Sequence, residues 1–75
     1  KIQPNPANDE VWLDATENLI GGEMKLIDIE GRVLFQMNIS KSRTLIRTDR
    51  LTNAIYFIQV KTEKGILTKR LVIAR

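Results

Sequence analysis

Residues 54–62 of this 75-residue chain read AIYFIQVKT, and they are the strongest strand candidate in the sequence. β-Branched and aromatic residues of this kind favour a pleated, half-buried surface. The apolar side chains would fall on both faces of the strand: Ile55, Tyr56, Phe57, Ile58 and Val60. Since a strand with two apolar faces is typical of the interior of a sheet, we expect residues 54–62 to be central in theirs.

The segments around this strand continue a period-two pattern with frequent turn signals. Downstream, Glu63-Lys64-Gly65 predicts a turn, and Ile66–Ala74 predicts a last strand antiparallel to residues 54–62. Upstream, Thr44–Thr48 predicts a short strand. Leu51 stands alone among polar neighbours, so we expect it to fill one end of the core from a crossing loop.

A hairpin is predicted in the middle of the chain. Met24–Ile29 and Arg32–Ile39 flank Glu30-Gly31, a two-residue connection whose glycine can adopt the positive φ that tight turns require. In the second arm one face is apolar throughout: Val33, Phe35, Met37 and Ile39. In the first arm the apolar residues change phase between Leu26 and Ile27, so either both faces are covered or a β-bulge intervenes.

Prolines mark the start of the chain. Pro4, Asn5 and Pro6 predict a rigid, extended entry at a sheet edge, because each ring fixes φ and neither proline can donate a ladder hydrogen bond. Glu10–Ala15 predicts the first strand, with Trp12 on the opposite face from the other apolar residues. Six or seven such strands, with turn signals about every 8 to 12 residues, predict a small antiparallel all-β sandwich.

The composition excludes most catalytic chemistry. The chain has no cysteine and no histidine, which removes disulfides, thiolate zinc sites and the commonest general base. Ser40 and Ser42 therefore have no histidine to activate them, and we expect no enzyme activity and no cofactor. At 43% hydrophobic residues, a chain of this length forms a core near the lower size limit. A single domain over residues 1–75 is the expectation.

Other binding classes have weak support. Asp9, Glu10 and Asp14 suggest a calcium site, but Glu10 and Asp14 would lie about 13 Å apart on a strand, so we expect solvated charges and no metal. Trp12 could stack on a sugar, which keeps a carbohydrate-binding or adhesion module as the alternative function, although packing is expected of a single tryptophan. Neither Trp12 nor Tyr56 is interleaved with basic residues, so no nucleic-acid partner is expected. No segment approaches about 18 consecutive apolar residues, so no membrane span is expected.

Four motifs resemble one known family. They are Pro4-Asn5-Pro6-Ala7-Asn8-Asp9, Ile27-Asp28-Ile29-Glu30-Gly31-Arg32, Ala54-Ile55-Tyr56-Phe57-Ile58-Gln59-Val60, and Gly65 followed by Thr68-Lys69-Arg70-Leu71-Val72-Ile73. In this order and spacing they resemble the type A C-terminal sorting domain of the Bacteroidetes type IX secretion system, over nearly the whole chain. The chain departs from the family pattern at Gln3, where the family often has an aromatic residue, and at Ala54, where it usually has glycine.

The resemblance implies an immunoglobulin-like sandwich at the C-terminus of a longer exported protein, whose cargo domain lies N-terminal in the same chain. The implied partners are the components of an outer-membrane translocon, which read the domain in the periplasm, and a sortase-like protease. That protease usually removes the domain and joins the cargo to a cell-surface anchor. The domain itself would be a passive sorting signal for a secreted or surface-displayed protein.

The resemblance also directs attention to the C-terminal strand. The residues expected to contact the translocon are Lys69, Arg70, Leu71, Val72, Ile73 and Arg75. An edge strand with interspersed cations can offer both charge and backbone hydrogen bonds, although the same cations could simply protect the edge from aggregation. Gly31, Tyr56, Gly65 and the proline motif are expected to have structural roles.

The net charge of +3 is distributed unevenly. Residues 1–46 carry five Lys and Arg against seven Asp and Glu, for −2, whereas residues 47–75 carry seven against two, for +5. The basic excess therefore lies on the last loops and the terminal pair of strands. An acidic partner surface is the expectation.

Overall fold

The computed structural model describes residues 2–3, 9–15 and 19–74. Over these residues the chain forms seven strands and no helix. The strands are β1 (Ile2–Gln3), β2 (Glu10–Asp14), β3 (Glu23–Asp28), β4 (Val33–Asn38), β5 (Arg43–Arg47), β6 (Ala54–Thr62) and β7 (Gly65–Ile73). None of the described residues belongs to a helix long and apolar enough to span a membrane.

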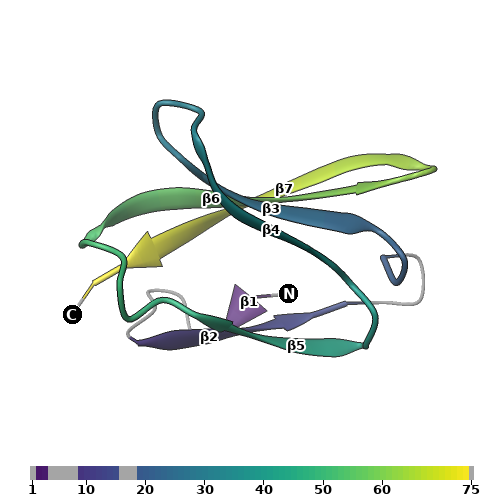
Figure 1. Ribbon diagram of the computed structural model, residues 1–75, viewed down its shortest axis with the longest axis horizontal. Helices are drawn as coiled ribbons and strands as arrows, with labels where there is room; N and C mark the ends of the chain where they lie inside the picture. Colours follow the sequence, from purple (N-terminus) through teal and green to yellow (C-terminus); the bar gives the residue numbers. More distant parts are fainter. Residues whose placement is uncertain (1, 4–8, 16–18, 75) are drawn as a thin grey trace.

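Two antiparallel sheets form the layers of a sandwich (Figure 1). One sheet has the strand order β1-β2-β5 and the other has the order β4-β3-β6-β7. The chain passes from one sheet to the other after β2, after β4 and after β5. Layers of three and four antiparallel strands connected in this way form an immunoglobulin-like β-sandwich. The predicted fold class is confirmed.

The core lies between the two layers and is built from the inward side chains of both sheets. Along β2, β3 and β6, buried residues alternate with more accessible ones, as the pleat of a strand requires. The core residues are Val11, Leu13, Met24, Leu26, Ile39, Ile46, Tyr56, Ile58, Val60, Leu71 and Ile73. Leu51 packs against this core from the loop between β5 and β6, as predicted.

β6 is paired on both sides, with β3 and with β7, which confirms its predicted central position. Nine residue pairs join β6 to β7, from Ala54 opposite Ile73 to Thr62 opposite Gly65. Among the described strands β7 pairs with β6 alone, so it is an edge strand. The C-terminal hairpin therefore contributes both the centre and one edge of the larger sheet.

All six predicted strands, from the one at Glu10–Ala15 to the one at Ile66–Ala74, agree with the observed strands to within one residue at each end. Two details of the predicted central hairpin are wrong. Its connection has four residues, Ile29–Arg32, rather than two. Val33 does not share a face with Phe35 as predicted: it is 49% exposed and pairs with Ile27, whereas Phe35 pairs with the buried Leu26. A β-bulge accounts for the changed face of Val33, because the β3–β4 pairing shifts register between Leu26 and Ile27.

Candidate functional site on the terminal hairpin

The residues predicted to contact the translocon lie on β7, and the pleat divides them between its two faces. Leu71 and Ile73 are buried in the core. The accessible members of the set are Lys69, Arg70 and Val72, of which Val72 is half-buried. Arg75 and the proline motif, Pro4, Asn5 and Pro6, lie outside the described residues. A partner that binds the folded domain therefore reaches only the accessible members through their side chains.

Lys69 and Arg70 are neighbours in sequence, yet they lie on opposite faces of the larger sheet. Lys69 is directly opposite Ile58, which points into the core, whereas Arg70 is opposite Phe57 on the outer face. Residues directly opposite each other on paired strands share a face. Lys69 is nevertheless exposed, as is every residue of β7 from Gly65 to Arg70. A cation on the inward face of an edge strand hinders unwanted pairing with another chain.

The turn between β6 and β7 holds this strand in place. Glu63 and Lys64 form the tip of the turn, and Gly65 follows with a φ of +134°. Residues with a Cβ rarely adopt this backbone conformation. The Lys64 N–H donates to the Thr62 hydroxyl over 3.1 Å. Gly65 therefore stands at a position that requires glycine.

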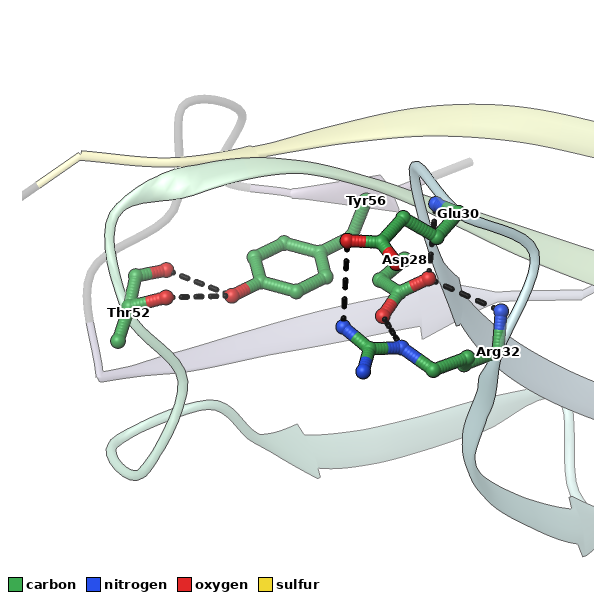
Figure 2. Close-up of polar contacts among 5 residues, drawn as sticks. All are labelled: Asp28, Glu30, Arg32, Thr52 and Tyr56. Atoms are coloured by element: carbon green, nitrogen blue, oxygen red, sulfur yellow. Dashed lines mark hydrogen bonds and ion pairs between the residues drawn. The ribbon is translucent and has the colours of Figure 1, made fainter.

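Tyr56 anchors the loop that crosses between the sheets (Figure 2). Its ring is buried opposite Leu71 of β7, and its hydroxyl donates to the Thr52 carbonyl oxygen over 2.8 Å. The Thr52 hydroxyl lies 3.1 Å from the same phenolic oxygen. A tyrosine near the start of this strand that bonds back to the preceding corner is the tyrosine corner of immunoglobulin-like sandwiches. It ties the crossing loop to the core beside the terminal strand.

Asp28 organises the turn between β3 and β4, although the sequence pattern does not single it out (Figure 2). Its Oδ1 accepts hydrogen bonds from the N–H groups of Glu30 and Arg32, each at 2.9 Å. Its Oδ2 accepts from the Arg32 Nε–H at 2.8 Å, and Gly31 has the predicted positive φ, +86°. The available signal is an Asp two positions before Glu-Gly, since aspartate readily bonds to the backbone two residues on.

These contacts favour the ionised form of Asp28. The Arg32 backbone N–H contributes most to lowering the pKa of the Asp28 carboxyl below its ordinary value of 3.8. Partial burial acts in the opposite direction and raises the pKa. The Arg32 guanidinium and the Glu30 N–H lower it further. A carboxyl with a lowered pKa stabilises the fold above its unfolded-state pKa, and the contribution is lost as pH falls through the folded-state pKa.

We therefore expect Asp28→Asn to lower the thermal midpoint near neutral pH and to lower it less as the pH falls below about 4. Asparagine keeps the shape and one acceptor oxygen, so the pH-dependent part of the difference reports the charge. Thermal melts of both proteins between about pH 7 and pH 2 measure it. A difference in midpoint that is constant with pH would contradict this role for the carboxylate.

The smaller sheet carries the residues considered for sugar and calcium binding. The Arg43 guanidinium lies over the Trp12 ring, 4.5 Å from the ring centroid, and Arg43 Nε is 3.3 Å from an Asp14 carboxylate oxygen. This cation–π contact occupies a ring face on which a sugar would stack. Among the residues that the structure describes, no three acidic side chains come together in a group that could hold a metal ion.

The fold, the tyrosine corner and the cationic edge strand define a small immunoglobulin-like module with an accessible terminal hairpin. The chain belongs to the secretion system C-terminal sorting domain family, whose model matches residues 1–74. No curated protein matches the chain.

This membership makes the chain a C-terminal sorting signal of the type IX secretion system. The predicted family and the predicted sorting function are thereby confirmed, and the carbohydrate-binding or adhesion alternative is not favoured. Domains of this kind interact with the type IX machinery and accompany cargo that is secreted or carried to the cell surface. In general they are not catalytic.

Proposed function

We propose that the accessible residues of β7 are the part of this sorting domain that the outer-membrane translocon recognises. The observation that carries the proposal is the exposure of β7 at every position from Gly65 to Arg70, which presents Lys69 and Arg70 on an edge strand. Edge strands and clustered cations both suit recognition by a protein partner of opposite charge.

The rest of the pathway follows from the family and is part of the same proposal. Residues 1–75 act as one domain at the C-terminus of an exported protein, with the cargo N-terminal to it in the same chain. A sortase-like protease cleaves the linker that precedes the domain and joins the cargo to the cell surface. The domain supplies no catalytic group of its own to this reaction, because it contains neither cysteine nor histidine.

A fusion of residues 1–75 behind a periplasmic reporter tests the proposed function. We expect the reporter to reach the cell surface in a host that has the type IX translocon and to stay in the periplasm when the translocon is deleted. Surface accessibility to added protease and fractionation measure the two locations. Retention of the reporter in the periplasm of both hosts would contradict the proposal.

The charges of β7 can be tested in the same fusion. Reversing both cations, Lys69→Glu and Arg70→Glu, should reduce surface delivery by about tenfold or more, because like charges at an interface with an acidic partner cost well over 1.4 kcal/mol. The matched control is Lys41→Glu with Arg47→Glu, which changes the net charge equally at two exposed positions, one in the loop before β5 and one on β5 of the smaller sheet. Thermal melts should show both variants folded. Equal loss of delivery in both would make net charge, not β7, the determinant.

A further inference from the structure

The outer face of the larger sheet is unusually apolar at the end where β6 begins. Because Tyr56 and Ile58 point into the core, the alternate residues Ile55 and Phe57 point outward. The pairing places their neighbours on the same face, with Ile27 opposite Phe57 and Val72 opposite Ile55. Val33 joins them through its pairing with Ile27. This outer patch, residues Ile27, Val33, Ile55, Phe57 and Val72, spans all four strands.

The described residues leave the outer patch uncovered, since the second sheet packs on the opposite face (Figure 1). Val33 and Ile55 are 49% and 41% exposed, and the other three members are half-buried. In an antiparallel sheet with one solvated face, polar residues are the rule at such positions. A contiguous apolar patch on a small domain indicates an interaction surface.

The charges around the patch restrict what can cover it. Arg70 is directly opposite Phe57 and therefore borders the patch on β7. Farther along the same face lie Lys61 and Lys25, with Glu23 3.6 Å from the Lys25 ammonium. The face thus carries an excess of positive charge, which complements an acidic surface. Two copies docked face to face would bring these cations together, which disfavours self-association.

We propose that the outer patch, together with Arg70, docks the sorting domain on a translocon protein whose contact surface is apolar and has an acidic rim. The inference rests on the proposed function and narrows it. It assigns recognition to the outward-facing residues of β7 and to the neighbouring strands of its sheet. Lys69, on the inward face, is then dispensable for docking.

A matched pair of apolar substitutions tests the patch in the reporter fusion. Ile55→Asn should lower surface delivery by about tenfold, since it places a polar side chain in the apolar contact. Leu45→Asn is the control, because Leu45 is a strand residue of the smaller sheet with nearly the same exposure, 39% against 41%. We expect less than about twofold loss for the control, with similar thermal midpoints for both variants. Normal delivery of Ile55→Asn would overturn the inference.

A second pair separates the two faces of β7. Arg70→Glu should reproduce most of the loss seen with the double reversal, and Lys69→Glu should deliver the reporter within about twofold of the wild type. An equal or larger loss for Lys69→Glu would overturn the outer patch as the docking surface. In that case the wild-type fusion still reaches the surface, so the proposed function stands. Failure of the wild-type fusion itself would contradict both proposals.

Two further measurements on the purified fusion test whether a second copy of the chain or a lipid surface covers the outer patch instead. We expect sedimentation velocity to show a monomer, and we expect no pelleting with vesicles of anionic phosphatidylglycerol. A dimer that Ile55→Asn dissociates would assign the patch to a second copy of the chain. Vesicle binding that the same substitution abolishes would assign it to a lipid surface. Either result would overturn the assignment to a translocon protein.

Discussion

Replacing Leu71 with alanine should lower the free energy of unfolding by about 2 to 5 kcal/mol. Leu71 is fully buried opposite Tyr56, so the shorter side chain loses apolar burial and leaves a cavity beside the tyrosine corner. Total stability at this chain length is about 4 to 11 kcal/mol, so the loss is a large fraction of it. Urea denaturation of the two proteins measures the difference.

The adjacent residue provides the control for this substitution. Val72 is half-buried on the outer face, and Val72→Ala should cost about 1 kcal/mol or less. Equal losses for Leu71→Ala and Val72→Ala would contradict the division of β7 into a core face and an outer face. For variants that remain folded, the outer-patch inference predicts a larger loss of export for Val72→Ala than for Leu71→Ala, because Val72 belongs to the patch and Leu71 does not.

Removing residues 65–75 should reduce surface delivery of the reporter to the level seen without the translocon. The deletion takes away the accessible cations of β7 and also two core residues, Leu71 and Ile73, which leaves β6 unpaired on one side. Both the recognised surface and the fold are therefore lost. Surface delivery at the wild-type level would contradict the proposed function.

Loss of fold and loss of recognition can be told apart in the truncated protein. Limited proteolysis of the fusion should show the truncated domain degraded and the Lys69→Glu, Arg70→Glu variant intact. If neither the truncated fusion nor the double variant reaches the surface, and only the truncated domain is degraded, then recognition requires more than a folded domain. Protease resistance of the truncated domain would show that β7 is not needed for the fold.

Much of this fold can be predicted from the sequence, because alternation over short segments is a local property. Residues 54–58 are apolar at every position, and residues 54–62 form the central strand as expected. The length of the β3–β4 connection could not be predicted in this way. It depends on the Asp28 carboxylate, which accepts hydrogen bonds from Glu30 and Arg32 and so shapes a longer turn around Gly31.

The candidate site shows a similar division. The sequence points to β7, but the expected contacts include Leu71 and Ile73, which the fold buries in the core. The exposure of Lys69 could not be foreseen, because Lys69 shares a face with the buried Leu71 and Ile73 and is nevertheless exposed. The position of the outer patch could not be foreseen either, because residues 54–62 have apolar side chains on both faces and only the fold shows which face the second sheet covers. Both are properties of tertiary packing.

Gly65 also affects which residues of β7 face solvent, because the two-residue turn before it sets the register in which β7 pairs with β6. Side chains on a strand alternate between two faces, so a slip of one residue exchanges the two sets completely. After such a slip Arg70 would point into the core and Leu71 would point to solvent. The positive φ of Gly65 and its pairing with Thr62 across the turn favour the observed register over the slipped one. The turn glycine thereby determines which side chains of β7 are accessible to a partner.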